Sequence, residues 1–220
     1  MSFFIHIPDY ILYEDDHILV VNKPHGLMVE PDRKGHPNLL QQVKKYLKET
    51  IKAGEVYAQH IHRLDRPVSG IVLFAKQKNV LRNLSEQFAE RKVKKFYKAF
   101  TSNAPQEMQG VLEHWHRKEK NKAVLNFEPI EYGEKAKLAY SVEKITDHKF
   151  LWKIELHTGK YHQIRAQLAS LHCPILGDTT YGSNVPYLEN AIALQAYKLV
   201  FNHPVSGLEL SMEANDSAIF

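Results

Sequence analysis

The chain contains a single cysteine, Cys173, in 220 residues. One thiol excludes an internal disulfide framework, and the thirteen histidines lack the cysteine partners of a Cys-rich zinc pattern. No apolar run is long enough to span a bilayer, and the opening MSFFIHIPDY lacks the basic start and apolar core of a secretory signal. Low-complexity tracts and internal repeats are also missing. These absences predict a protein of a reducing compartment, with the cytoplasm as the expected location.

The composition is that of a folded domain with a mild excess of positive charge. Hydrophobic residues make up 44% of the chain, which is enough for a sizeable core. One domain over residues 1–220 is the simplest organisation, and two small domains are the alternative. The net charge of +4 does not by itself indicate a nucleic-acid partner, because lysine-rich stretches are more often solvated faces.

Residues 57–76 combine a polar loop with a buried strand and read YAQHIHRLDRPVSGIVLFAK. The apolar run 71–75 predicts the strand, so the polar residues before it should lie on a loop at its mouth. Asp65 is the one carboxylate of this segment, and Arg63 and Arg66 flank it. Nearby cations favour the ionised form of a carboxyl group, which suits a nucleophile or an electrostatic partner. A structural turn with solvated arginines is the other interpretation.

Hydrophobic periodicity predicts the surrounding helices and strands. The expected helices cover residues 38–53, 79–91 and the segment after Gly159, and the expected strands cover 18–21, 71–75, 93–100 and 150–156. Asn38 is the start signal of the first helix. Residues 101–135 are polar and predict hairpins and loops. Lys23, at a strand end, has two interpretations: it faces the site or, as is more common for a lysine in this position, it is solvated. We expect an α+β fold with a mixed, mainly antiparallel sheet flanked by helices.

Three segments resemble the motifs of one enzyme family. Residues 62–76, HRLDRPVSGIVLFAK, are similar to the central motif of the RluA-type pseudouridine synthases, with Val68 in place of a common threonine. Residues 14–26 resemble the opening pattern of that family, and residues 158–165 resemble its third motif, with Lys160 in place of an arginine. Lysine keeps the charge but loses the bidentate geometry of arginine.

Two further departures from the family pattern were found. Gln195 stands where relatives usually carry a histidine, and an amide cannot carry a proton, so this position should not transfer one. Glu30 and Pro31 stand where relatives often have His-Pro. The family-like opening begins near the first residue, so no S4-type RNA-binding domain is expected before it.

The resemblance implies an enzyme that isomerises uridine to pseudouridine in RNA, either tRNA or ribosomal RNA, without a metal or other cofactor. Asp65 would be the nucleophile at C1′ or the base that removes the 2′ proton. Arg165 would pair with Asp65 and orient it, and Tyr97 would stack on the target base or move the proton at C5. The resemblance assigns substrate binding to His62, Arg63, Leu64, Lys160, His162 and Gln163.

A monomer without an obligatory protein partner is expected. The target nucleotide must leave the RNA stack at a cost of a few kcal/mol, and Arg63 is the candidate either to fill the vacated space or to grip the neighbouring phosphate. A structural domain with an incidental ion pair is one alternative, and two other functions are also alternatives. One is a catalytically silent RNA-binding protein of the same fold. The other is a nucleoside hydrolase or glycosidase, which needs a second carboxylate about 5–9.5 Å from Asp65, and Asp178 is the candidate for it.

Overall fold

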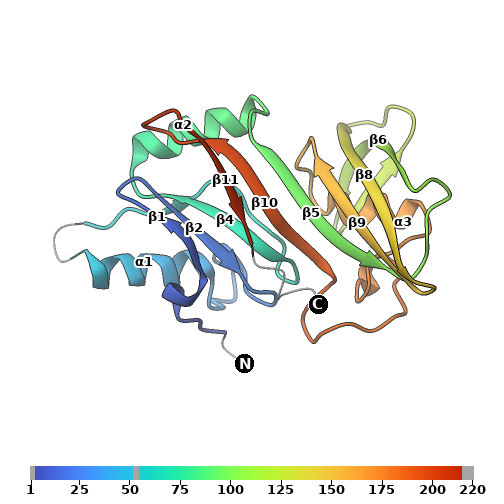
Figure 1. Ribbon diagram of the computed structural model, residues 1–220, viewed down its shortest axis with the longest axis horizontal. Coiled ribbons are helices and arrows are strands. Elements are labelled where there is room, and N and C mark those ends of the chain that lie inside the picture. Colours follow the sequence, from blue (N-terminus) through green and yellow to red (C-terminus); the bar gives the residue numbers. More distant parts are fainter. Residues whose placement is uncertain (1–2, 52–54, 215–220) are drawn as a thin grey trace. The chain divides into compact units, whose positions relative to one another are not determined.

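The computed structural model describes residues 3–51 and 55–214 of the chain. The described residues form two compact units, one built from residues 3–93 together with 196–214, and the other from residues 94–195. The first unit is therefore discontinuous in sequence. In Figure 1 the first segment of this unit runs from blue to green, and its second segment, near the C-terminus, is red. None of the described helices is long and apolar enough to cross a membrane.

The first unit is built around an antiparallel pair of buried strands, β2 and β4. Its strands are β1 (Ile11–Glu14), β2 (Ile18–Lys23), β3 (Gln59–His60), β4 (Ser69–Ala75), β10 (Leu194–Asn202) and β11 (Glu209–Glu213). They lie in the order β1-β2-β4-β10, with β3 paired to β4 and β11 paired to β10. The register sets Lys23 of β2 opposite Gly70 of β4, so the turns that adjoin these residues lie close together.

Apolar residues of the central strands form the core of the first unit. All seven residues of β4 are buried, as expected of a strand that is covered on both faces. Alternate residues of the strands share one cluster with α2 (Lys78–Ala89). Its main members are Ile18, Val20, Ile71, Leu73, Val80, Leu84, Leu199 and Phe201. The strands are flanked in Figure 1 by α2 and by α1 (Leu39–Thr50). A short 3₁₀ helix, η1 (Ile7–Tyr10), precedes β1.

Both predicted helices of the first unit are confirmed, with shifted ends. The Asn38 side chain accepts a hydrogen bond from the Gln41 N–H at 3.0 Å, which confirms Asn38 as the start signal of α1. Residues 52–53 of the predicted helix lie outside the described residues. The second helix ends at Ala89 rather than at Arg91, because Arg91 adopts a left-handed backbone with φ of 59° that a right-handed helix cannot include.

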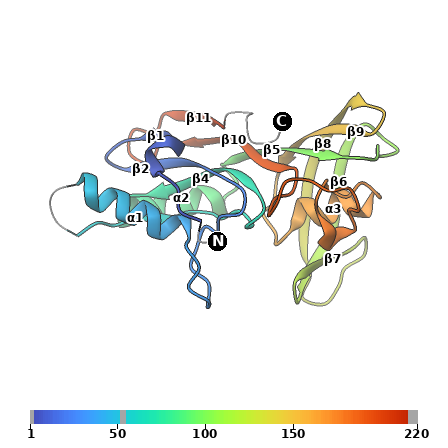
Figure 2. The ribbon, with the colours of Figure 1, turned by 90° about the horizontal axis from the view of Figure 1, so that it is seen from below.

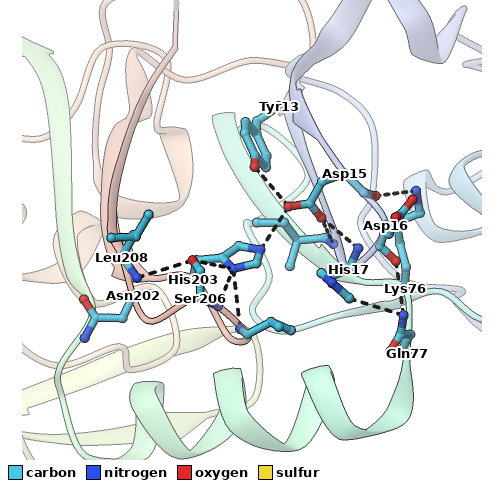
Figure 3. A network of polar contacts seen from close by, with 12 residues as sticks. Tyr13, Asp15, Asp16, His17, Lys76, Gln77, Asn202, His203, Ser206 and Leu208 are labelled. Carbon is cyan, nitrogen blue, oxygen red and sulfur yellow. Dashed lines mark hydrogen bonds and ion pairs between the residues drawn. The ribbon is translucent and has the colours of Figure 1, made fainter.

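A polar network joins the turn after β1 to the turn after β10 (Figure 3). Asp15 Oδ1 accepts hydrogen bonds from the N–H groups of His17 and Ile18, at 2.7 and 2.8 Å. Its second oxygen lies 2.9 Å from His203 Nε2. His203 Nδ1 accepts from the Ser206 N–H at 3.1 Å, which assigns the ring proton to Nε2 and makes it the donor to Asp15. The network therefore connects two residues that lie 188 positions apart.

The second unit is an antiparallel sheet followed by a short helix. Its strands are β5 (Lys94–Thr101), β6 (Gln109–Glu119), β7 (Lys122–Asn126), β8 (Glu134–Thr146) and β9 (Lys149–Leu156), in the order β5-β9-β8-β6-β7. After β9 come α3 (Gln163–Ser170) and the 3₁₀ helix η2 (Thr179–Tyr181). In Figure 2, α3 lies on one side of these strands, next to β7. The buried indole of Trp152 donates to Thr101 Oγ1 at 2.8 Å, so its polar atom is satisfied within the core.

The described elements confirm the α+β class and the mainly antiparallel pairing. The hairpin predicted within residues 101–135 is also confirmed, since β6 pairs with β7 from Trp115 opposite Asn126 to Glu119 opposite Lys122. This part of the chain has more regular structure than its polar composition indicates, because β6 alone spans eleven residues. The buried positions of β6 are occupied by His114 and His116, which an apolar pattern cannot reveal.

Candidate functional site

Asp65 lies on the turn that leads into β4. The Val68 N–H donates to the Asp65 carbonyl oxygen at 3.1 Å, which closes a four-residue turn directly before the strand begins at Ser69. The Asp65 side chain is half-buried, and the preceding Leu64 is buried and anchors the loop. The predicted position of Asp65, on a loop at the mouth of a buried strand, is confirmed.

Lys23 ties this turn to the turn that follows β2. Its amine nitrogen lies 2.7 Å from the Leu27 carbonyl oxygen and 3.0 Å from that of Pro24, with a longer contact of 3.4 Å to that of Arg66. Arg66 and Gly26 form two more hydrogen bonds. The Gly26 N–H donates to the Arg66 carbonyl oxygen at 2.8 Å, and Arg66 Nε donates to the Gly26 carbonyl oxygen at 3.0 Å. The Lys23 side chain is fully buried, so the prediction of a solvated lysine is wrong.

The environment of Lys23 changes its ionisation. Burial lowers the pKa of Lys23 from 10.5 to about 7, and the charge of Asp65 opposes part of this shift. At neutral pH the amine is therefore divided between its charged and neutral forms. A neutral amine keeps two N–H donors, which match the two shorter carbonyl contacts. Lys23 is thus a titratable group close enough to Asp65 for the charge of one to affect the other.

His62 is fixed by contacts within the first unit. Its Nε2 accepts a hydrogen bond from the Leu73 N–H of β4 at 3.3 Å, and its ring stacks on that of Phe88 in α2, with centroids 5.1 Å apart. These contacts make His62 part of the support for the Asp65 loop. Its assignment to substrate binding stays a prediction.

Arg63 is exposed and is held by an acidic residue from a different segment. Its Nη1 donates to Glu30 Oε1, and His60 Nε2 lies 3.7 Å from the other Glu30 oxygen. Burial lowers the pKa of His60, while Glu30 acts in the opposite direction, and the net shift is downward. Glu30, a departure from the family pattern, therefore engages the guanidinium that is expected to enter the RNA stack.

Arg165 forms a buried ion pair with Asp178 in the second unit. Its Nε and Nη2 donate to the two carboxylate oxygens of Asp178 at 2.7 and 2.8 Å. The two residues are 5% and 1% exposed, so the pair is shielded from water. The Arg165 guanidinium carbon also lies 5.2 Å from the centroid of the Tyr181 ring. Bidentate pairing on one side and a ring on the other fix the plane of the guanidinium.

Three of the predicted binding residues lie between the end of β9 and the first residue of α3. Gln163 Oε1 accepts from the Thr158 hydroxyl at 2.8 Å and from the Lys160 N–H at 3.0 Å, which locks the turn into α3. The Lys160 side chain forms an ion pair with Glu134 of β8. His162 has a left-handed backbone with φ of 51° directly before the helix. Their roles in substrate binding stay predictions.

Tyr97 lies on β5, where a strand was predicted, opposite Ile154 of β9. Its side chain is 8% exposed. Asp65 belongs to the first unit, whereas Tyr97 and Arg165 belong to the second. The pairing of Arg165 with Asp65 and the contact of Tyr97 with the target base therefore stay predictions.

Sequence reasoning did not identify Asp178 as the partner of Arg165. Asp178 was considered only as the second carboxylate of a glycosidase, but both of its oxygens accept hydrogen bonds from Arg165. It acts as a buried counter-ion, so the glycosidase interpretation loses its candidate acid. The two residues are thirteen positions apart, a spacing that follows no local rule for helices or turns.

The chemistry available in the described part of the chain is that of acids, bases and fixed charges. No cluster of three or more His, Cys, Asp or Glu residues there is arranged to hold a metal ion. Burial raises the pKa of the Cys173 thiol to about 11, so this residue remains a protonated thiol and a poor nucleophile at neutral pH. Asp65 with Lys23, and Arg165 with Asp178, are the charged pairs around which a mechanism can be built.

Known proteins are similar to this chain over nearly its whole length. Residues 17–170 match the family described as RNA pseudouridylate synthase. A dual-specificity RNA pseudouridine synthase, RluA of Escherichia coli strain K12, is 33% identical and is covered over 91% of its length by 93% of this chain. An uncharacterized RNA pseudouridine synthase of Aquifex aeolicus is also 33% identical, over 97% of this chain and 71% of that protein.

Solved structures have the same fold. Human RNA pseudouridylate synthase domain containing 4 aligns with a TM-score of 0.78 and 25% identity, over 95% of this chain and 89% of that one. Human RNA pseudouridylate synthase domain containing 1 aligns with a TM-score of 0.72 and 21% identity, over 94% and 83% of the two chains, which shows a shared fold. The family match over residues 17–170 and the 33% identity to relatives aligned over most of their lengths show that the chain belongs to the RNA pseudouridine synthase family, whose members are isomerases.

Proposed function

We propose that the protein converts specific uridines of tRNA or ribosomal RNA to pseudouridine. In this reaction the N1–C1′ bond of uridine breaks, the uracil turns, and C5 bonds to C1′. The C5 proton is released and N1 gains one, so the product is an isomer and no electrons are transferred to another molecule. The similarity to a relative named for dual specificity supports a range of RNA substrates rather than a single one.

Asp65 is the proposed catalytic group. Its half-buried position on a turn that Lys23 and Arg66 fix to the Pro24–Leu27 segment is the observation that carries this proposal. A carboxylate held in one orientation reacts with less reorganisation than a mobile one. Asp65 either attacks C1′ of the flipped uridine or removes its 2′ proton.

The remaining roles follow from the family motifs. Arg165 would orient Asp65, and Tyr97 would stack on the uracil or move the proton at C5. His62, Arg63, Leu64, Lys160, His162 and Gln163 would bind the RNA around the flipped nucleotide. We further propose that residues 1–220 act as one catalytic domain and as a monomer, without an obligatory protein partner. The cytoplasm is the proposed location because it contains the proposed substrates.

The test is pseudouridine mapping of total RNA by carbodiimide labelling and primer extension. Cells that lack the gene would be compared with cells complemented by the wild type, by Asp65→Ala, and by Asp16→Ala as a matched control. Asp16 is an exposed aspartate of the same unit, outside the proposed site. We expect one or a few uridines to lose the modification without the gene. The wild type and Asp16→Ala should restore it, whereas Asp65→Ala should not.

The proposal would be contradicted if the deletion strain kept every pseudouridine and the purified protein converted no uridine. Restoration by Asp65→Ala would instead remove Asp65 from the catalytic role. If the protein binds RNA without converting it, the catalytically silent RNA-binding protein becomes the better description.

A further inference from the structure

A row of contacting charged and aromatic side chains, called the stack below, runs from the buried Arg165 of α3 to the exposed Lys118 of β6 in the second unit. The Tyr161 and His162 rings are stacked, with centroids 3.8 Å apart and planes inclined by 17°. Tyr181 meets His162 edge-on, with centroids 5.7 Å apart, and the Arg165 guanidinium lies over Tyr181. At the other end, Lys118 Nζ lies 4.3 Å from the centroid of the Tyr161 ring.

The inner part of this stack is held by hydrogen bonds. The Tyr181 hydroxyl accepts from the Ala123 N–H at 2.7 Å and lies 3.2 Å from His162 Nδ1. The Tyr161 backbone is fixed as well, because His116 Nε2 lies 2.7 Å from its carbonyl oxygen and His116 itself is buried. His162 supports one face of the Tyr161 ring, so this ring is oriented before any ligand arrives.

The outer part of the stack is an exposed lysine. Lys118 lies on β6 and is the exposed neighbour of the Tyr161 ring. A cation over an aromatic ring at an exposed site changes an equilibrium constant by about 2- to 5-fold. A nucleobase stacked on an aromatic side chain changes it by about 5- to 150-fold. A base can therefore displace the Lys118 ammonium group, which then remains near enough to pair with a phosphate.

The charge around Tyr161 favours an anionic polymer. The β6–β7 hairpin carries three exposed lysines, Lys118 of the stack together with Lys120 and Lys122. Such a group of cations attracts phosphates and releases counterions when it binds them. An aromatic ring among cations is the arrangement that proteins use for single-stranded nucleic acid, because every base offers a stacking face.

We propose that Tyr161, together with Lys118, is a binding site for an unpaired nucleotide of the RNA substrate, with the base stacked on Tyr161 and its phosphate paired with Lys118. The inference rests on the proposed function in that it takes RNA as the ligand, but it does not depend on the isomerisation step. Paired bases are excluded, because their faces are covered by their neighbours in the helix. The site would therefore select RNA with a single-stranded segment.

The test is the affinity of Tyr161 variants for two RNA probes, all in the Asp65→Ala background so that no probe is converted. One probe is an unstructured strand of about eight nucleotides that contains 2-aminopurine. The other is a duplex of about 16 base pairs. The variants are Tyr161→Phe, Tyr161→Leu and Lys118→Gln, with Tyr132→Leu as the control. Tyr132 belongs to the same unit and is 85% exposed.

Tyr161→Leu should weaken binding of the single strand by about 5- to 150-fold, whereas Tyr161→Phe should stay within about 2-fold of the parent because phenylalanine keeps the stacking face. Lys118→Gln should make the plot of log affinity against log salt less steep by about 0.7, the value for the loss of one phosphate contact with a single strand. Quenching of 2-aminopurine on binding should be seen with Tyr161→Phe and lost with Tyr161→Leu. Tyr132→Leu should match the parent throughout.

Equal loss of duplex and single-strand binding in Tyr161→Leu would overturn the proposal, because it would show that the residue shapes the surface rather than stacks on a base. The proposal would also be overturned if Tyr161→Leu bound the single strand as tightly as the parent and had the same melting temperature, because Tyr161 would then not bind RNA. The proposed function fails separately, by the absence of pseudouridine in the mapping experiment.

Discussion

Arg165 and Asp178 are joined inside the second unit by two parallel hydrogen bonds, Nε to Oδ2 at 2.7 Å and Nη2 to Oδ1 at 2.8 Å. Asp178→Asn removes the negative charge that accepts both hydrogen bonds, and breaking a buried ion pair costs up to about 3–5 kcal/mol. We expect Asp178→Asn to lower the free energy of unfolding by about this amount. Urea denaturation of the variant and the wild type measures the difference.

A double variant separates the structural role of this pair from its role in the site. Arg165→Met with Asp178→Leu removes both charges and should recover much of the stability that Asp178→Asn loses, because apolar residues can replace a buried ion pair. The double variant should be inactive if Arg165 acts on Asp65. Full activity in the double variant would contradict that role of Arg165.

Gly70 of β4 has no room for a side chain. Its φ is +119°, and a Cβ atom there would lie 2.3 Å from the carbonyl oxygen of Ala196 in β10. Backbone atoms cannot rotate away, so we expect Gly70→Ala to cost about 3 kcal/mol or more. Gly35→Ala is the matched control. It has a φ of +72° and nothing within 4 Å of the added atom, and it should cost about 1–2 kcal/mol. Similar losses in the two variants, measured by thermal unfolding, would argue against the clash.

The buried amine of Lys23 should make stability depend on pH. Burial lowers its pKa from 10.5 to about 7 in the folded protein. Between these values the unfolded chain binds more protons than the folded one, so this residue makes the free energy of unfolding rise as the pH rises from about 7 towards 10.5. Lys23→Met should remove this slope. The free energy of unfolding of the wild type minus that of the variant should therefore increase with pH.

Urea denaturation at pH 7, 8 and 9 measures this effect, and the exposed Lys34→Met serves as the control. The control should differ from the wild type by a constant amount. A constant difference for Lys23→Met as well would mean that Lys23 stays charged in the folded state.

Glu30 should restrain the binding of RNA through Arg63. The two side chains form an exposed ion pair, which contributes about 0–1 kcal/mol. Glu30→Gln should free the guanidinium and remove a negative charge, so RNA should bind up to about 5-fold more tightly at low salt. The plot of log affinity against log salt should steepen by about 0.9 if Arg63 gains one phosphate contact.

Glu49→Gln is the matched control for this prediction. Glu49 is an exposed acid of α1 in the same unit and lies 3.9 Å from Lys45. The loss of one exposed acid should have the same general electrostatic effect in both variants, so only the steeper salt dependence is specific to Glu30. An identical slope in the two variants would show that Arg63 does not reach a phosphate.

The elements of the fold could be predicted where their cause is local. The run Ile71–Ala75 lies within β4, and the Asn38 cap begins α1, because a continuous apolar run and a helix cap depend on neighbours in sequence. The end of α2 was misplaced because the left-handed backbone of Arg91 leaves no signal in residue type.

The site was less predictable because its contacts are not local. Asp65 was found through its motif, and its place on the loop through the strand that follows it. The burial of Lys23 was missed because its carbonyl partners come from the turn at residues 24–27 and from Arg66, 43 positions away. No pattern around Lys23 alone can show that these carbonyls converge on it.

The discontinuous first unit has a consequence for protein synthesis. Leu199 and Phe201, which complete the apolar cluster around Ile71 and Leu73, are made only after the whole second unit. At about 5–20 residues per second, the roughly 120 residues after position 93 occupy the ribosome for on the order of 6–24 seconds. During that interval the β4 edge that later pairs with β10 is open. We therefore expect the nascent chain to expose this edge to chaperones that hold unpaired strands, until β10 is made and pairs with β4.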